Sequence, residues 1–456
     1  MPAAAPPTPP TITLLAAALA EGRTSSRALV EAALARIADP EGEGKRCFLR
    51  VYDETARAAA DAQDRLRKAG YVASPLAGLP ISIKDLFDVA GERTLAGSTA
   101  LRDAPPAAGD APVVARLRAA GAVLIGRTNM TEFAFSGVGI NPHYGTPGNP
   151  YDRRRIPGGS SSGAPISVMD GMAVVAIGTD TGGSVRIPAA FCGTVGFKPT
   201  QRRIPRDGAT PLSATLDSIG PLGRSVACCA ITDAVLAGEP PLVPPAAEIA
   251  GLRLGVPRSV VLDDLDQQVA SAFERACATL ARAGARLVDL PLAELKDYAA
   301  INAKGGFSPP EAYAWHAPLL ARRGEDYDPR VRLRIERGRG MSAAEYVTLC
   351  RERAEFIARV EARIAELDAL IMPTLPLIAP EIAAFERDDD FWRLNSRILR
   401  NTAIINFLDG CALTLPIHPP GAAPVGLMLV GKGGTDHRLF SLGLAVEAAI
   451  ERERQG

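Results

Sequence analysis

The feature that most constrains the fold is an alternation of short apolar runs with longer amphipathic segments. Residues 251–290 read as GLRLGV, then QQVASAFERACATLARAG, then ARLVDL, the pattern of a strand, a helix and a second strand. The same rhythm appears where VVARLRAA at 113–120 precedes the apolar run 122–125. Such alternation is typical of α/β proteins. We therefore expect an α/β fold with a large mixed, mostly parallel central sheet, covered by helices on both faces.

Other segments extend this pattern and suggest how the chain is organised. Helices are also expected over 26–37 and 352–367, and strands over 172–178 and 369–374. Residues 1–10 are rich in proline and read as a disordered lead-in to one domain over 11–456. The segment 238–248 looks like an internal linker. The stretch 300–350 is irregular and charged, so we expect 250–365 to hold a variable, substrate-facing region.

Composition argues against several classes of function. Lys plus Arg and Asp plus Glu both number 51, so no net charge favours nucleic acid or an anionic membrane. Seven cysteines without a CxxC pair, and four histidines without HxxxH or HExxH spacing, indicate neither a disulfide framework nor a metal site. The N-terminal apolar run lacks a basic region and resembles neither a signal peptide nor a membrane span. We expect a cytoplasmic protein without a cofactor, metal, nucleic-acid partner or membrane contact.

The first candidate for chemistry is a lysine within the apolar segment LAGLPISIKDLFDVAG, residues 76–91. Lys84 could simply extend toward water, or pair with Asp85 or Asp88. A lysine held in an apolar environment can also lose its proton near neutral pH, whereas an arginine cannot. Lys84 is therefore a candidate general base.

Two Gly/Ser-rich segments supply candidate nucleophiles. The segment IPGGSSSGAP at 156–165 contains a G-x-S-x-G match, but a nucleophile elbow should follow a buried strand, and YDRRRIP is not one. The segment 173–193 runs from an apolar strand into Thr-Asp-Thr-Gly-Gly-Ser, ending at Ser184. Its single Asp-Thr-Gly triplet gives only one carboxylate and so disfavours an aspartic protease. Either the two glycines form a plain turn, or their N–H groups form an oxyanion hole beside Ser184.

The order and spacing of these segments together resemble the amidase signature family. The resemblance runs from Lys84 through Gly-Gly-Ser-Ser and Asp-Thr-Gly-Gly-Ser-Val-Arg to FCGTVGFKPT at 191–200. It also includes GRTNMTEFAFSGVGINPHYGTPGNP at 126–150 and LDSIGPLGRSV at 216–226. It is strong over about 76–226 and moderate over 365–447. The resemblance implies the amidase signature fold.

The resemblance also implies roles for individual residues. Ser184 matches the family's nucleophile, Ser160 the relay serine that follows an unusual cis peptide bond, and Lys84 the base. The oxyanion hole would comprise the backbone N–H groups of Thr181, Gly182, Gly183 and Ser184. Supporting roles fall to Ser161 and Arg186. Candidates for the substrate pocket are Met130, Phe133 and Phe135, which are equally good core residues, and Asn406, which we expect to face substrate.

The expected function is hydrolysis of a small or aryl carboxamide, extending to carbamates (urethanes) or esters, through an acyl-enzyme on Ser184. The partner would then be a small-molecule amide, and the resemblance allows a homodimer. One alternative is the glutaminase subunit of a tRNA-dependent amidotransferase, and another is a non-catalytic binding protein on the same fold. The mechanistic rival is a Ser-His-Asp hydrolase, using His316, His418 or His437.

Overall fold

The computed structural model describes residues 9–455, so the expected lead-in over residues 1–10 falls mostly outside the described residues. Eleven strands form one sheet in the order β1-β3-β2-β4-β6-β5-β10-β11-β9-β7-β8. Their bounds are β1 Phe48–Val51, β2 Pro80–Lys84, β3 Val123–Thr128, β4 Val175–Asp180, β5 Val195–Lys198, β6 Ser218–Gly223, β7 Arg253–Pro257, β8 Arg286–Leu290, β9 Ala369–Pro373, β10 Cys411–Pro416 and β11 Gly426–Gly431.

The sheet is mixed, as predicted, but it is not mostly parallel. Of the ten strand pairings described, four are parallel, and these join β3-β2-β4 and β9-β7-β8. The other six are antiparallel: one joins β1 to β3 at the edge, and five run through the centre of the sheet from β4 to β9. The prediction rested on strand–helix–strand units such as β7–α9–β8, which do pair in parallel. Strands such as β10 and β11, joined by a short connection, pair antiparallel instead.

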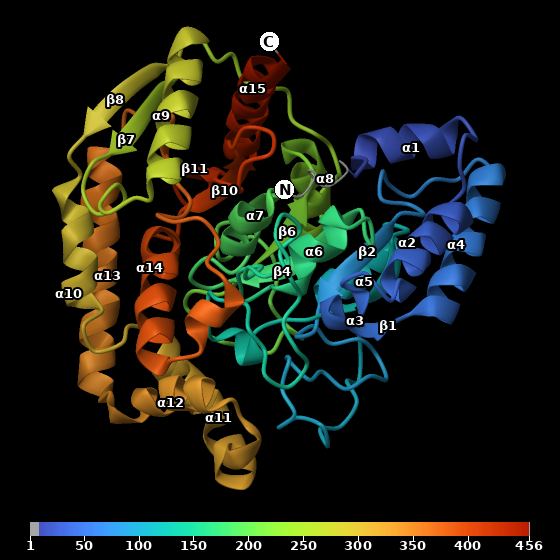
Figure 1. The fold of residues 1–456 in the computed structure, drawn as a ribbon, viewed down its shortest axis with the longest axis horizontal. Coiled ribbons are helices and arrows are strands. Elements are labelled where there is room, and N and C mark those ends of the chain that lie inside the picture. Colours follow the sequence, from blue (N-terminus) through green and yellow to red (C-terminus); the bar gives the residue numbers. More distant parts are fainter. Residues whose placement is uncertain (1–8, 456) are drawn as a thin grey trace.

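Two layers of helices cover the sheet (Figure 1). In one layer α5, α8, α15 and α9 contact one another in series, and in the other α2, α3, α6, α7 and α14 do so. The helix bounds are α1 Ile12–Ala20, α2 Ser26–Ala38, α3 Gly44–Cys47, α4 Asp53–Lys68, α5 Pro112–Ala119, α6 Gly163–Met169, α7 Arg186–Cys192, α8 Val226–Ala237, α9 Gln267–Arg282, α10 Asp297–Ile301, α11 Ser308–Arg323, α12 Pro329–Glu336, α13 Ala343–Arg363, α14 Asp388–Phe407 and α15 Asp436–Gln455.

The alternation of side chains along β11 shows how the core is divided between the two faces. Leu427 and Leu429 pack in an apolar cluster with side chains of α9 and α15. Met428 and Val430 point the other way, into a cluster with side chains of α13 and α14. Successive strand residues face opposite sides of a sheet, so both faces of this sheet are buried. That explains why the strands read as continuous apolar runs in the sequence.

The stretch 300–350 is helical, which differs from the irregular structure expected there. It holds α11, α12 and the first turns of α13, and α13 begins at a capping box formed by Ser342 and Glu345. Its many charges lie on partly exposed helices rather than in loops. The helix expected over 352–367 consequently starts earlier, at Ala343, whereas those expected over 26–37 and 113–120 agree with α2 and α5. Over residues 9–455, no helix is both long and apolar enough to cross a membrane.

Candidate active site

The pairing of β2 with β4 brings the candidate base and the candidate nucleophile to one edge of the sheet. The two strands are parallel, with Ile83 opposite Ile177. Lys84 is the last residue of β2, and β4 ends at Asp180, four residues before Ser184. Because parallel strands end on the same side of a sheet, residues far apart in the sequence meet there.

Lys84 is fully buried and contacts two hydroxyl groups. Its Nζ donates hydrogen bonds to Ser160 Oγ at 2.7 Å and to Thr179 Oγ1 at 2.8 Å. It forms no ion pair with any carboxylate in residues 9–455, and its neighbour Asp85 pairs with Arg127 instead. Burial lowers the pKa of Lys84 to about 7, although the charges of Asp217 and Asp180 oppose this change. A neutral amine is therefore available near neutral pH.

The Gly-Gly-Ser-Ser loop lies directly against the Ser184 loop. The peptide bond between Gly159 and Ser160 is cis. The backbone N–H of Ser161 donates to the carbonyl of Ser184 at 3.3 Å, and the Ser161 hydroxyl donates to the carbonyl of Thr179 at 3.4 Å. Among the described residues no hydrogen bond joins the Ser160 and Ser184 hydroxyls, and catalytic hydrogen bonds often shorten only when substrate binds.

The loop that follows β4 offers backbone donors beside Ser184, with one difference from the expectation. The N–H of Gly183 donates to Asp180 Oδ1 at 2.9 Å, so it is already engaged. Within the described part of the chain, the N–H groups of Thr181, Gly182 and Ser184 have no protein acceptor. Gly183 has a φ of +130°, and a Cβ there would lie 2.2 Å from Thr402 Oγ1, so only glycine fits.

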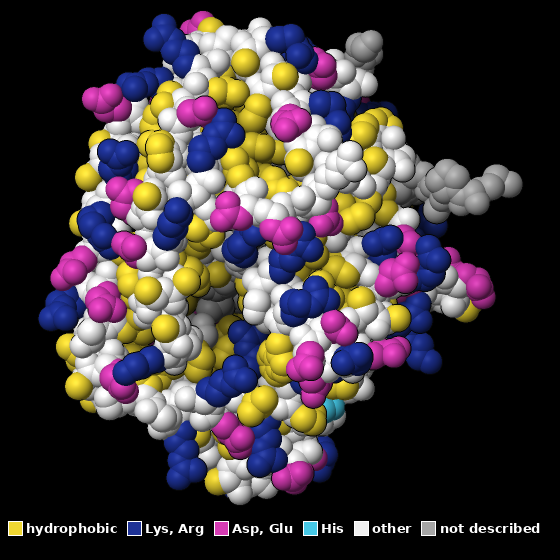
Figure 2. Space-filling model, turned by 60° about the vertical axis from the view of Figure 1, so that its left-hand side comes forward, with side chains coloured by type: hydrophobic (Ala, Val, Ile, Leu, Met, Phe, Trp, Pro, Cys, Tyr) yellow, Lys and Arg dark blue, Asp and Glu magenta, His cyan; other side chains and the backbone are white. Residues whose placement is uncertain are grey.

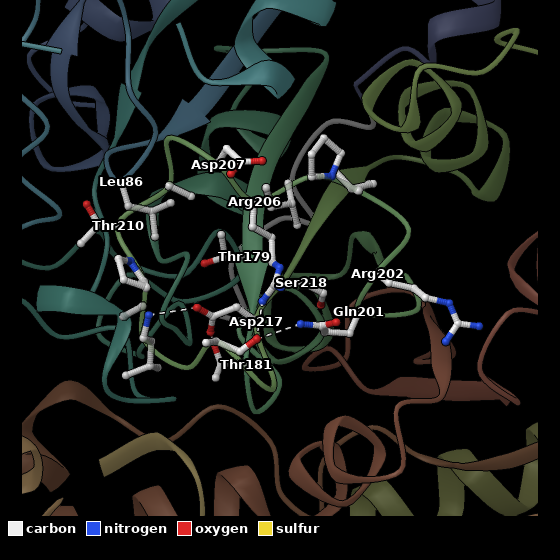
Figure 3. Close-up of a pocket in the computed structure, with 18 residues that line it drawn as sticks. Leu86, Thr179, Thr181, Gln201, Arg202, Arg206, Asp207, Thr210, Asp217 and Ser218 are labelled. Carbon is white, nitrogen blue, oxygen red and sulfur yellow. Dashed lines mark hydrogen bonds between the residues drawn. The ribbon is translucent and has the colours of Figure 1, made fainter. Parts of the chain in front are cut away.

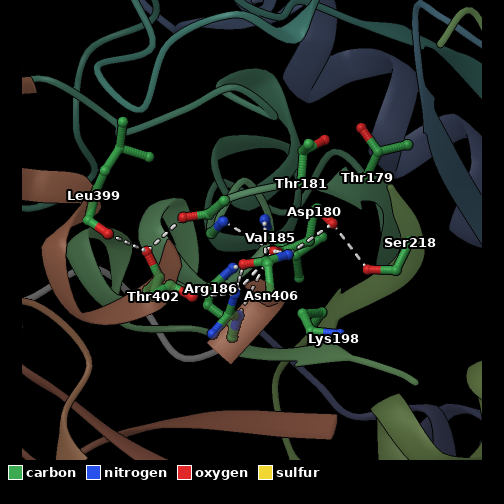
Figure 4. Close-up of polar contacts among 12 residues, drawn as sticks. Thr179, Asp180, Thr181, Val185, Arg186, Lys198, Ser218, Leu399, Thr402 and Asn406 are labelled. Atoms are coloured by element: carbon green, nitrogen blue, oxygen red, sulfur yellow. Dashed lines mark hydrogen bonds and ion pairs between the residues drawn. The ribbon is translucent and has the colours of Figure 1, made fainter. Parts of the chain in front are cut away.

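A buried ion pair braces this loop from beneath (Figure 4). Arg186 donates to Asp180 through Nη2 at 2.9 Å and through Nε at 3.0 Å, and both side chains are fully buried. Asn406, from α14, donates to Asp180 Oδ1 at 2.9 Å and accepts from Arg186 at 2.6 Å. Burial alone would raise the pKa of Asp180, but the Arg186 charge holds it well below its usual range. Arg186 thus fixes the loop and does not reach the cavity.

Ser184 opens into a cavity of about 290 Å³ between its own loop, α14 and the segment before α11. A second cavity of about 430 Å³ lies on the other side of Thr181 and is lined by Thr179 and Asp217 (Figure 3). Both cavities share Ala134, Thr181 and Leu212. A recess with basic side chains at its rim is visible on the face shown in Figure 2. The segment 298–309 helps to line the first cavity, within the region expected to face substrate.

Only one of the four predicted pocket residues lines the cavity at Ser184. Phe135 does so, whereas Met130, Phe133 and Asn406 do not. Phe133 packs its ring against His316 and Tyr327, and Met130 is fully buried in the same apolar cluster. Asn406 points beneath the loop toward Asp180. Proximity to the motif in sequence says little about which way a side chain points.

The histidines of the rival mechanism lie elsewhere. His316 hydrogen-bonds Tyr327, His418 hydrogen-bonds Tyr151, and His437 lies beside Glu239. None of the three lines either of the two cavities. Within residues 9–455, no three His, Cys, Asp or Glu side chains gather closely enough to hold a metal ion.

Sequence reasoning missed three polar residues that hold the site together. Thr179 is a second hydrogen-bond partner of Lys84. Asp217 accepts from Thr181 Oγ1 at 2.6 Å and from the backbone of Leu212 and Ser213, beside the loop that carries Ser184. Thr402 donates to the carbonyl of Gly182 at 2.6 Å. Two of the three carried a signal, because Asp217 stands in the LDSIGP segment that resembles the family and Thr179 begins the Thr-Asp-Thr-Gly-Gly-Ser run.

Comparisons with known proteins agree with this geometry. The chain is 40% identical over 405 residues to a 2-amino-5-chloromuconic acid deaminase of Comamonas testosteroni, covering 87% of this chain and 86% of that protein. It is 35% identical over 470 residues to one of the subunits of the glutamyl-tRNA(Gln) amidotransferase of Roseiflexus sp. strain RS-1, covering 95% of each chain.

Solved structures give the same result. One described as an amidase has a TM-score of 0.87 at 33% identity and covers 96% of this chain and 99% of its own. The peptide amidase of Stenotrophomonas maltophilia has a TM-score of 0.79 at 27% identity, covering 97% of each chain. The family model for amidases matches residues 28–440. This chain therefore belongs to the amidase signature family of hydrolases, which act on carbon–nitrogen bonds.

Proposed function

We propose that the chain hydrolyses small carboxamides, extending to carbamates or esters, with Ser184 as nucleophile, Ser160 as relay and Lys84 as base. The observation that carries the proposal is the buried Lys84, held 2.7 Å from the Ser160 hydroxyl and without an ion-pair partner in the described chain. Burial that lowers a lysine pKa to about 7 produces a base suited to neutral pH.

The proposed reaction moves one proton along two hydroxyl groups. Lys84 accepts the proton of Ser160 as Ser160 accepts that of Ser184, and Ser184 Oγ bonds to the substrate carbonyl carbon. Free N–H groups of Thr181, Gly182 and Ser184 stabilise the oxyanion. As the carbon–nitrogen bond breaks, Ser160 gives its proton to the leaving amine and regains one from Lys84. Water then enters by the same route and releases the acid from the acyl-enzyme.

The glutaminase component of an amidotransferase is the second candidate, because relatives named as amidotransferase subunits match almost the whole chain. Another relative, from Pseudomonas sp. strain ADP, is one subunit of 1-carboxybiuret hydrolase, 38% identical over 377 residues. Expression with neighbouring genes and purification through a tag on this chain would separate the candidates. A stand-alone amidase purifies and turns over without another chain, as a monomer or a homodimer.

The test of the proposed mechanism is covalent labelling combined with turnover of simple amides. A fluorophosphonate should label Ser184, as located by mass spectrometry, and Ser184→Ala should abolish both labelling and ammonia release. Ser160→Ala should reduce turnover by on the order of 10³-fold or more. The matched control is Ser162→Ala, since the Ser162 hydroxyl is buried without a hydrogen-bond partner among the described residues. Full activity in Ser160→Ala would disprove the relay.

A further inference from the structure

The cavity at Ser184 is lined by two arginines and by no acidic residue. Arg334 comes from α12 and Arg400 from α14, and the remaining lining is apolar or neutral. Leu399 and Ala403, which lie on either side of Arg400 along α14, face Gly182, and a Cβ added to Gly182 would contact both of them. A substrate whose carbonyl lies at Ser184 therefore occupies a cavity whose charged lining residues, within the described chain, are two arginines.

Arg334 is held in place by neutral groups only. Its Nη1 donates to the carbonyl of Phe135 at 2.7 Å, and its guanidinium lies 4.5 Å from the centre of the Phe135 ring. No carboxylate in residues 9–455 forms an ion pair with it. Burial lowers the pKa of Arg334 to about 10, and the positive charge of Arg337 lowers it further.

Arg400 is also held by hydrogen bonds to neutral groups, although the more distant charges of Asp263 and Asp264 favour its cation. It donates to Asn401 Oδ1 at 3.1 Å and to the carbonyl of Val261 at 3.4 Å, and it has no ion-pair partner in the described chain. Other arginines of the same helices do find carboxylates. Arg330 of α12 pairs with Asp388 at 2.8 Å, and Arg397 of α14 pairs with Asp266 at 3.0 Å. The unpaired state is thus a feature of the cavity rather than of the helices.

We propose that the preferred substrate is an amide that also carries a carboxylate, bound by Arg334 and Arg400 while Ser184 attacks the carbonyl. This inference rests on the proposed function. A partly desolvated guanidinium without a counter-ion is costly, and a carboxylate is the group whose shape and charge complement it. The cavity, of about 290 Å³, limits the substrate to a small molecule.

The same cavity disfavours glutamine. Glutamine carries an ammonium group as well as a carboxylate, and no acidic residue lines the cavity to receive that cation. Glutaramate is glutamine without the amino group, so the two compounds differ in that one charge. A preference for glutaramate over glutamine would separate this chain from a glutaminase.

The test compares amides matched in length. Ammonia release is measured with glutaramate against pentanamide and with succinamate against butanamide, and glutamine serves as the ammonium-bearing analogue. We expect kcat/KM to be at least about tenfold higher for the carboxylate of each pair. Arg334→Gln and Arg400→Gln should each raise KM for glutaramate about tenfold, and should lower kcat/KM for pentanamide by a much smaller factor. Equal rates for the charged and neutral amides would overturn the proposal.

Two surface variants serve as matched controls. Arg332→Gln changes a residue of α12 that pairs with Glu325 and Glu336 outside the cavity. Arg393→Gln changes a residue of α14 that pairs with Asp390. Both should leave KM for glutaramate unchanged. Equal loss of activity toward charged and neutral amides in the two cavity variants would indicate a structural role and would overturn the proposal.

Binding to an inactive variant separates this inference from the proposed function. Titration calorimetry of Ser184→Ala should show binding of glutaramate, no binding of pentanamide, and loss of glutaramate binding on adding Arg334→Gln. That pattern, combined with no hydrolysis of any amide by the wild-type protein, would support the carboxylate site and contradict the amidase mechanism. Hydrolysis of neutral amides without selective binding would do the reverse.

Discussion

Two buried ionisable groups at the ends of β2 and β4 are accommodated in opposite ways. Asp180 keeps its charge because Arg186 and Asn406 surround it with charge-assisted hydrogen bonds. Lys84 has only hydroxyl partners, and burial lowers its pKa to about 7. The paired group is suited to holding a loop still, and the unpaired group to accepting a proton. Charge pairing therefore distinguishes the brace from the base.

The largest effect is expected from removing the base. Lys84→Met should lower kcat/KM by on the order of 10³-fold or more, because within residues 9–455 Ser160 Oγ has no other hydrogen-bond partner that could take its proton. Stability at pH 6 should be unchanged or higher, since an apolar side chain replaces a buried amine. Steady-state ammonia release and urea unfolding measure the two quantities. Near-normal activity in Lys84→Met would refute the assignment of Lys84 as base. The control is Lys304→Met, which removes a lysine from an exposed ion pair.

Loss of the ion pair between Arg186 and Asp180, which braces the loop, should show first as a loss of stability. Arg186→Met leaves the buried Asp180 carboxylate without its counter-ion, which should cost about 3–5 kcal/mol of unfolding free energy. Asp180→Asn in the same chain should restore part of that loss, because no buried charge is then left unpaired. Urea unfolding followed by circular dichroism measures both. The distinction between brace and base fails if Arg186→Met is as stable as the wild type.

The pH dependence of catalysis reports the base directly. Lys84 must be neutral to act, and its pKa is about 7, so kcat/KM should fall about tenfold for each pH unit below that value and level off above it. A stopped assay in buffers of constant ionic strength measures the profile. A rate independent of pH between 5 and 7, as a rough working range, would contradict a lysine base.

The same group links stability to pH. On unfolding, Lys84 returns toward its ordinary value of 10.5 and takes up a proton, so the unfolded chain binds more protons between about pH 7 and 10.5. The contribution of Lys84 to stability therefore rises with pH across that window. The unfolding free energy of the wild type relative to Lys84→Met should increase from pH 7 to 9, roughly the accessible part of the window. A constant difference would show that the amine stays charged in the folded protein.

The smallest effect is expected from removing the Thr179 hydroxyl, the second hydrogen-bond partner of Lys84. Thr179→Val keeps the side-chain shape and removes one hydrogen-bond acceptor from Lys84, so turnover should fall by several-fold, about 0.5–1.5 kcal/mol. Thr194→Val is the control, because the buried Thr194 hydroxyl has no partner among the described residues. The contribution of Thr179 would be disproved if both variants behaved alike.

Much of the fold could be predicted from local patterns. The β7–α9–β8 unit was predicted because an amphipathic helix and its flanking apolar strands appear in the local sequence. The antiparallel centre of the sheet could not be predicted in this way. β5, for example, pairs with β10, more than two hundred residues later, and that choice depends on packing of the whole chain.

The same contrast between local patterns and long-range packing applies to the residues of the site. Lys84, Ser160 and Ser184 could be named because their motifs are contiguous and resemble a known family. Thr402, which bonds Gly182, and Arg400, which lines the cavity, could not be named, since they come from a helix without a distinctive motif. The pocket residues nearest the motifs, Met130 and Phe133, turned out to face the core.

Helix α14 performs two tasks with adjacent stripes of side chains. Thr402 and Asn406 fasten the loop at Ser184, while Leu399, Arg400 and Ala403 form a wall of the cavity. Directed evolution of substrate preference would naturally randomise that wall. A larger side chain at Ala403 that shifted the helix would also disturb Gly182 and its neighbours. New specificity should thus be easier to acquire through the 298–309 segment, which lines the cavity without holding the catalytic loop.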